Sequence, residues 1–246
     1  MRIAGCLLAF ILCAGAPAVA GIRATYTVAG EAAPVVVEID DAGVTRLGTP
    51  GGDFDFLVIG SSAYVIGSNP DDPEGRSMAI RADDLVAAIR RAGIRIPADG
   101  DTRSIGSLPP PGAGFRDVGA ATVAGVAGHR FRWSSASAKS ASAAVTMTVA
   151  DDPALRRGGE AVGIALKTII IPMTTIMDGD VQKLAGWMQQ MLPFLDRGLP
   201  LAFDDELVLR ELKRDAQFPV GRMTLPSTIV NGAQLDQLIA SQSAEK

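Results

Sequence analysis

The chain has few of the side chains that most often carry nucleophilic or metal chemistry: its 246 residues include two cysteines and one histidine. Cys6 and Cys13 both lie within the first twenty residues, which have the features of a cleaved leader. Without that leader the chain has neither thiol nor disulfide. This excludes a cysteine nucleophile and a zinc site of the Cys/His type. The core alone must therefore stabilise the fold, and the chain is long enough for that.

The single histidine, His129, lies in an alternating segment with Phe131 and Trp133. A Ser-His-Asp site would need this residue as its base. We interpret it instead as a packed or partly exposed strand residue. Adjacent aspartates, such as Asp151-Asp152, fall at turns and helix starts, where aspartate is locally favoured. A hydrolase that uses two carboxylates distant in sequence stays open as an alternative.

Nucleotide-binding glycine motifs and calcium loops are also absent from the sequence. No GxGxxG follows a strand, and no Walker loop occurs. The acidic stretch 69–75 lacks the alternating carboxylates and the closing glutamate of a calcium loop. We therefore predict no catalytic residues, no metal site and no cofactor, and hence a protein that is not an enzyme.

Basic residues are outnumbered, which bears on partners. Without Arg2, the 23 basic residues fall to 22 against 27 acidic ones, a net charge of −5. A nucleic-acid surface would need a basic stripe, and none is seen, so we expect no nucleic-acid partner.

The first twenty residues resemble a signal peptide. Arg2 is a short positive region, Ile3–Ala14 is apolar, and Ala18–Ala20 is a small-residue cleavage site. The apolar run is too short for a spanning helix, which needs about 20 residues. We predict a signal peptide at 1–20, a single exported domain at 21–246 and a periplasmic location.

Most of the remaining chain shows the alternation of half-buried strands. Val35, Val37 and Ile39 fall on one side of one segment, and Phe54, Phe56 and Val58 on one side of another. Further strands are expected at 22–28, 44–47, 63–67, 129–133, 143–149, 198–203 and 206–213. Short strands joined by hairpin-sized turns predict an antiparallel sheet.

Helical patterns occur at four places. The first covers 83–92, with Asp83 as its N-cap, and the second covers 161–171, with a break or kink at Pro172. A third helix follows Asp178 or Asp180, and a short one covers 234–240. The Pro/Gly-rich stretch 97–114 predicts a long loop inside one domain, although two subdomains stay open.

Methionines gather after the predicted sheet, at Met173, Met177, Met188 and Met191, with Trp187 among them. Methionine is unbranched and adapts to irregular apolar surfaces. Two interpretations follow: core packing between helices and sheet, or a deformable lining for an apolar ligand.

Several segments resemble a known family. They are a Tyr-x-Val strand start, Gly119–Phe131 with its Gly-Ala-Ala-Thr-Val-Ala-Gly run, Asp151-Asp152-Pro153, Arg197–Leu201 and Phe218-Pro219. The chain is similar to uncharacterised periplasmic proteins whose fold looks like that of the lipoprotein carriers (LolA- and LppX-like). This resemblance implies an α+β fold, a curved antiparallel β-sheet (incomplete barrel) with helices covering the concave face. It also implies a lipid or lipoprotein acyl chain bound between the sheet and the helices.

We therefore expect a periplasmic, non-enzymatic binding protein for an apolar ligand. The alternative is a structural or interaction module of the cell envelope, which would have a filled core and an envelope protein partner. The predicted ligand-binding residues are the inward aromatic and aliphatic side chains of the sheet and the facing helical ones: Tyr26, Phe54, Phe56, Tyr64, Phe131, Trp133, Met147, Met173, Met177, Trp187, Met188 and Met191.

The leader prediction has a direct test. We expect the intact mass of the natively expressed protein to correspond to a chain that starts at Gly21, because Ala18–Ala20 fits the small-residue preference of the signal peptidase. Mass spectrometry measures this. A mass that includes Cys6 or Cys13 with an attached acyl group would contradict it.

Overall fold

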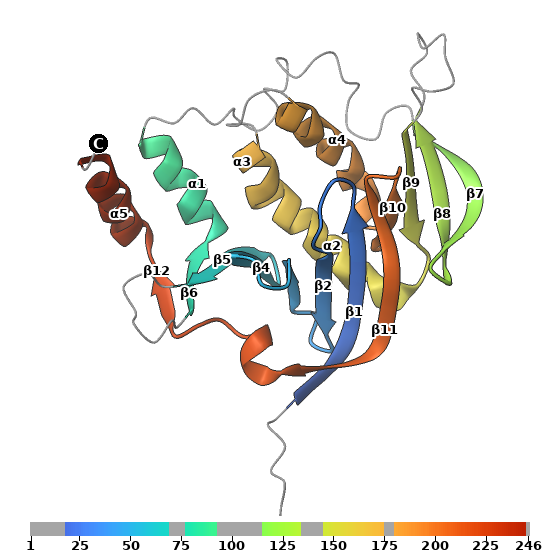
Figure 1. Ribbon diagram of the computed structural model, residues 1–246, viewed down its shortest axis with the longest axis horizontal. Helices are drawn as coiled ribbons and strands as arrows, with labels where there is room; N and C mark the ends of the chain where they lie inside the picture. Colours follow the sequence, from blue (N-terminus) through green and yellow to red (C-terminus); the bar gives the residue numbers. More distant parts are fainter. Residues whose placement is uncertain (1–17, 69–76, 93–114, 134–144, 175–179, 245–246) are drawn as a thin grey trace, which may run out of the picture.

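The computed structural model describes residues 18–68, 77–92, 115–133, 145–174 and 180–244 (Figure 1). These residues form a mixed α/β fold with one large sheet of twelve strands, which does not close into a barrel. The predicted loops at 69–75 and 97–114 lie outside the described residues.

The sheet consists of β1 (Ala18–Val28), β2 (Val35–Asp40), β3 (Thr45–Gly48), β4 (Phe54–Ile59), β5 (Ser62–Ser68), β6 (Ser77–Arg81), β7 (Phe115–Val123), β8 (Val126–Trp133), β9 (Val145–Ala150), β10 (Pro200–Phe203), β11 (Leu207–Pro219) and β12 (Thr228–Val230). Their order is β12-β6-β5-β4-β3-β2-β1-β11-β10-β9-β8-β7. All neighbouring pairs are antiparallel except β12 and β6, which run parallel. The predicted antiparallel sheet is confirmed.

The helices are α1 (Ala82–Arg91), α2 (Arg156–Ala165), α3 (Ile171–Thr174), α4 (Asp180–Leu195) and α5 (Gly232–Ala244), with the short 3₁₀ turns η3 (Pro153–Leu155) and η5 (Val220–Met223) and the π-helical segment η4 (Leu166–Ile170). Helix α2 contacts β2 to β5, α1 contacts β5 and β6, and α4 contacts β9 (Figure 1). None of the described helices is both long and apolar enough to cross a lipid bilayer.

The segments α2, η4 and α3 follow one another without a break, so Pro172 does not end the helix. Proline lacks an N–H and crowds the carbonyl four residues earlier, which normally kinks or breaks an α-helix. Here the N–H of Ile171 donates to the carbonyl of Leu166, five residues back. This wider turn directly precedes Pro172, and the helix continues to Thr174.

The predicted cap at Asp83 is wrong by two positions. Strand β6 runs directly into α1, so Arg81 occupies the N-cap position and makes no side-chain cap. Asp83 lies in the first turn, where its negative charge complements the helix dipole. By contrast, the expectation that Asp151-Asp152 lies at a helix start is confirmed, because Asp152 Oδ1 accepts the N–H of Ala154 at 2.9 Å and caps η3.

The main core lies between the helices and one face of the sheet, which we call the helical face. Val37, Ile39 and Val58 lie on this face, as their alternation predicts. They pack with Leu166 and other apolar residues of the continuous helix formed by α2, η4 and α3, which we call the long helix. The hydroxyl of Tyr26, also buried here, donates to the carbonyl of Pro200 at 2.9 Å. Burial raises the pKa of Tyr26 because it disfavours the phenolate.

Two adjacent glycines bring α2 into very close contact with its neighbours. A Cβ at Gly158 would overlap the Ile39 side chain, and one at Gly159 would overlap the carbonyl oxygens of Leu195 and Gly198. Only glycine permits such an approach of two backbones. The contact therefore fixes α2 against both β2 and the end of α4.

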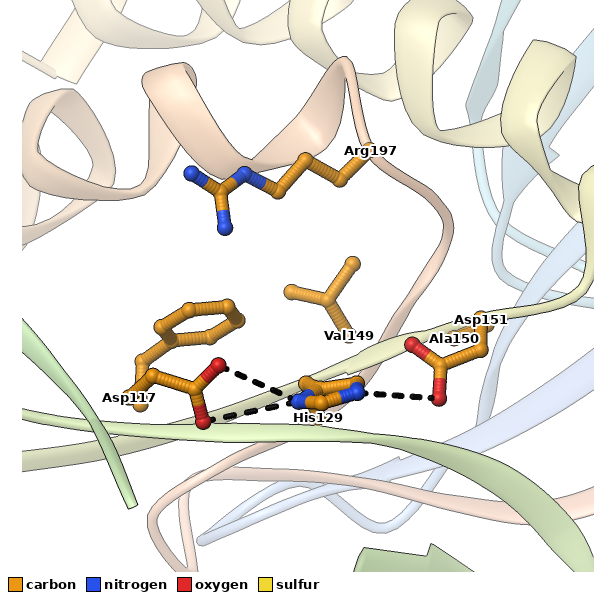
Figure 2. Close-up of a pocket in the computed structure, with 7 residues that line it drawn as sticks. Asp117, His129, Val149, Ala150, Asp151 and Arg197 are labelled. Carbon is orange, nitrogen blue, oxygen red and sulfur yellow. Dashed lines mark hydrogen bonds and ion pairs between the residues drawn. The ribbon is translucent and has the colours of Figure 1, made fainter. Parts of the chain in front are cut away.

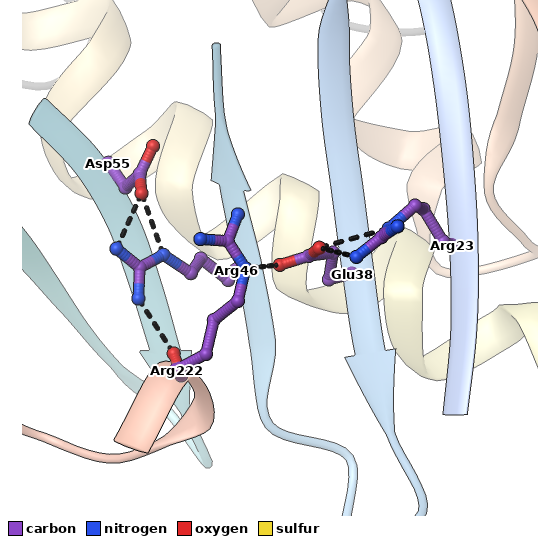
Figure 3. A network of polar contacts seen from close by, with 5 residues as sticks. All are labelled: Arg23, Glu38, Arg46, Asp55 and Arg222. Atoms are coloured by element: carbon purple, nitrogen blue, oxygen red, sulfur yellow. Dashed lines mark hydrogen bonds and ion pairs between the residues drawn. The ribbon is translucent and has the colours of Figure 1, made fainter. Parts of the chain in front are cut away.

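On the opposite face, η5 is attached to the sheet by a network of charges (Figure 3). Glu38 is only 1% exposed. Its carboxylate accepts hydrogen bonds from Arg23 of β1, at 2.8 and 3.0 Å, and from Nε of Arg222 in η5. Arg46 donates to the carbonyl of Arg222 at 2.7 Å and pairs with Asp55. The buried charge of Glu38 is therefore fully compensated, as burial requires.

The glycine contact generates a matched pair of variants. Gly159→Ala is expected to lower the free energy of unfolding by about 1–3 kcal/mol, the range of overpacked cores. Gly163→Ala on the same helix places its Cβ at 3.5 Å from Leu195 Cβ, an ordinary contact, and should stabilise by up to about 1 kcal/mol through helix propensity. Urea unfolding followed by circular dichroism measures both. Equal effects of the two variants would contradict the close packing.

Candidate functional site

The structure divides the predicted ligand-binding residues among several places. Tyr26, Phe131, Met147 and Met191 are buried, and Phe56, Trp133, Met173 and Met188 are partly exposed. Met177 lies outside the described residues, and the side chain of Trp187 in α4 is not described.

The inward placement of Tyr64 is wrong. Ala63 belongs to the core under the helices and Val65 packs against it, so Tyr64 points to the opposite face. There it packs with Leu57 and Ile66. Residues on alternate sides of a strand cannot share one lining, and Tyr64 therefore leaves the predicted set.

Several apolar side chains that are not fully buried lie on elements that pack around the end of the long helix, and we call them the apolar rim. They are Phe54, Phe56, Val65, Leu85, Met173 and Met188. Phe54 is 54% exposed, and its ring meets that of Phe56 edge to face at 5.5 Å. The contacts of α1 with β5 and η4, and of α3 with α4, bring the rim elements together.

A second apolar cluster lies where α4 covers β8, β9 and β10. It consists of Phe131, Met147, Val149, Met191, Phe194 and Phe203. The rings of Phe131 and Phe194 are 4.7 Å apart. This cluster forms one wall of a pocket of about 240 Å³, which we call the His129 pocket (Figure 2). Its lining residues are Asp117, His129, Phe131, Val149, Ala150, Asp151 and Arg197.

His129 lies between two carboxylates in this pocket (Figure 2). Its Nδ1 is 3.1 Å from Asp117 Oδ2, and its Nε2 is 3.6 Å from Asp151 Oδ2. The imidazole side chain is 45% exposed, as expected for a partly exposed strand residue. Both carboxylates come from neighbouring strand positions: Asp117 from β7 and Asp151 directly after β9.

A bulge in β7 aims Asp117 at the histidine. The register of β7 on β8 shifts between Asp117 and Gly119, where Gly119 has φ +106°. The N–H of Gly119 donates to Asp117 Oδ1 at 2.8 Å. This bond, with smaller contributions from His129 and Arg197, holds the pKa of Asp117 below its usual range.

The fourth polar group of the pocket is Arg197, in the turn after α4. Gly198 beside it approaches Ala150 so closely that a Cβ would overlap the Ala150 carbonyl, which fixes this turn on β9. The guanidinium carbon lies 5.2 Å from the Phe131 ring centre and 5.6 Å from that of Phe194. Within the described part of the chain, the guanidinium makes no side-chain hydrogen bond or ion pair.

The arrangement bears on two of the chemistries considered from sequence, a metal site and a Ser-His-Asp site. Asp117 and Asp151 lie at opposite ring nitrogens, so they do not converge on a shared metal position, and the described residues contain no group of three metal-ligating side chains. The seven lining residues include no hydroxyl, so the pocket offers no Ser-His-Asp arrangement. It offers charges of both signs beside an apolar wall.

The sequence signal for this pocket was weak. The sequence indicates His129 and the Asp151-Asp152 pair only separately, and it gives no sign of Asp117. Their meeting depends on the pairing of β8 with β7 and β9 and on the bulge at Gly119. One pattern could have indicated the pocket. In the strand that pairs with the strand of the only histidine, a glycine follows two residues after an aspartate, which is typical of a bulge.

Two further pockets lie away from this site. One of about 260 Å³ lies beside η5 and includes Arg46 and Thr224, and one of about 290 Å³ lies between α1 and α5 and includes Arg91 and Asp236. Neither of these two is lined by the apolar rim.

The lowered pKa of Asp117 gives a pH prediction with a fixed sign. Since the folded pKa lies below the unfolded value of about 3.9, the ionised carboxylate stabilises the fold above that pH. This stabilisation is lost as the pH falls through the folded pKa. The difference in unfolding free energy between the wild type and Asp117→Asn should therefore shrink from pH 5 to pH 3. Urea titrations at each pH measure it, and a constant difference would refute the assignment.

Comparison with known proteins assigns no family. The chain matches no protein-family model and no curated protein. The resemblance to lipoprotein carriers is therefore a prediction.

Proposed function

We propose that the protein is an exported, non-enzymatic binding protein that holds the acyl chain of a lipid or lipoprotein between its sheet and its helices. In this proposal the open sheet is the curved, incomplete barrel expected from sequence, and α1, α2 and α4 cover its concave face. The packing of these three helices on the sheet supports that arrangement. So does the position of Val37 and Ile39 on the helical face.

The observation that carries the proposal is the change in packing along the long helix. At its start, Gly158 and Gly159 leave no room for even a methyl group. At its end, Met173 is only partly buried, although it still packs against the core. The π-helical turn of η4 separates the two regions. Such turns inside α-helices are frequently found at functional sites.

The chemistry of the rim suits an acyl chain. All six rim side chains are apolar, and they include two aromatic rings and two flexible methionines. Each buried CH₂ of a ligand contributes about 0.8 kcal/mol, so a long chain needs no specific polar contact. Methionine adapts its shape to such a chain at little cost.

A structural or interaction module is the second candidate, favoured by the filled core. Met147, Leu195 and Leu201 have no exposed surface. The three pockets described above, lined by described residues, have volumes of 240–290 Å³, just below the usual range for ligand sites, which begins near 300 Å³. If this candidate is correct, the rim contacts a protein of the envelope instead of a lipid.

Native mass spectrometry of the purified protein, with analysis of extracted lipid, tests the proposal. We expect a bound acyl chain, and palmitate should displace a fluorescent fatty-acid probe. Met188→Glu and Met173→Glu should each weaken probe binding at least about tenfold, because the charge would have to be desolvated beside the chain.

Val118→Glu is the matched control, since Val118 is a 54% exposed apolar residue on β7, outside the rim. It should leave probe binding unchanged. Circular dichroism confirms that each variant is folded. A lipid-free protein that binds neither palmitate nor the probe would reject the carrier function in favour of the structural module.

A further inference from the structure

We propose that the His129 pocket binds a small zwitterion, with the ligand's carboxylate on Arg197 and its ammonium on Asp151. The inference is independent of acyl-chain binding, because none of the pocket's lining residues belongs to the apolar rim. It depends on the unequal way in which the four polar side chains of the pocket are already engaged.

Arg197 supplies the site for the anionic end. Its guanidinium is placed over Phe131 and Phe194, and within the described chain no carboxylate pairs with it. Contact with an aromatic face leaves the N–H groups at the edge of the guanidinium plane available. A planar fork of this kind binds a carboxylate through two parallel hydrogen bonds.

The two aspartates differ in what they can still accept. Asp117 is occupied by the Gly119 N–H and by His129 Nδ1. Asp151 is less engaged: its carboxylate forms an ion-pair contact with His129 Nε2 at 3.6 Å, which is beyond hydrogen-bond distance, and no side-chain hydrogen bond to this carboxylate occurs among the described residues. Asp151 therefore supplies the site for the cationic end.

The other walls define the kind of molecule that joins these two ends. Phe131, Val149 and Ala150 are buried and apolar, so they suit a short aliphatic linker. The volume of about 240 Å³ limits the ligand to a small molecule. A ligand with only a negative charge would approach Asp117 and Asp151, and one with only a positive charge would approach Arg197, so each single charge meets repulsion.

His129, the only histidine, reports on the pocket directly. In an untagged protein, the imidazole gives a single set of ¹H–¹³C NMR signals. We would titrate the mature chain with ω-amino carboxylates of increasing length, from 3-aminopropanoate to 6-aminohexanoate. Butanoate and butylamine, which carry one charge each, are the ligand controls.

We expect a saturable shift of the His129 signals with at least one amino carboxylate, and at least tenfold weaker binding of both controls. Arg197→Gln and Asp151→Asn should each weaken binding about tenfold or more. Arg210→Gln on β11 and Asp205→Asn, both exposed and outside the pocket, should leave it unchanged. Circular dichroism of every variant verifies folding.

Three results would overturn the proposal. One is the absence of any shift up to about 50 mM of each compound, far above the range of metabolite sites. Another is equal binding of butanoate, which would indicate a plain anion site on Arg197. The third is unchanged affinity in folded Arg197→Gln and Asp151→Asn variants. Fatty-acid binding is unaffected by any of these outcomes, so the two functions are tested separately.

Discussion

The contact between Gly159 of α2 and the backbone that follows α4 is the constraint on which both candidate sites depend. It brings the carbonyls of Leu195 and Gly198 against the helix with no side chain between them. Since Gly198 also approaches Ala150 of β9, one turn of chain is held by a helix and a strand together. That turn carries Arg197, so helix packing places the guanidinium over the His129 pocket.

The same constraint separates the two kinds of surface. Near Gly158 and Gly159 the helix–sheet interface is closely packed, and the turn beside it carries the charged side chain of Arg197. Farther along, beyond η4, the interface offers Met173 and the other apolar rim residues. The two proposals need opposite environments: an apolar one for an acyl chain and a charged one for a zwitterion. The first lies beside the long helix and the second beside β7 to β9 and the turn after α4.

Sequence reasoning succeeded where the signal is local. The alternation of Val35–Ile39 predicted β2 and the face that it buries, and Asp152 predicted a cap. It failed where neighbouring elements determine the end of a helix or the pairing of strands. The cap of α1 lies at Arg81 because β6 enters the helix directly, and β12 has only three residues, too few for a pattern. The His129 pocket needed strand register, which one sequence does not reveal.

The pairing of β1 with β11 has a consequence for folding. It joins a strand that begins at Ala18 to one that ends at Pro219, and it links the β2–β6 side of the sheet to the β7–β10 side. Contacts of such high sequence separation carry a large loop-closure cost and slow folding. The β1–β11 pair cannot form until nearly the whole chain has been synthesised. Until then, the β2–β6 side and the β7–β10 side of the sheet are not joined through their central pair.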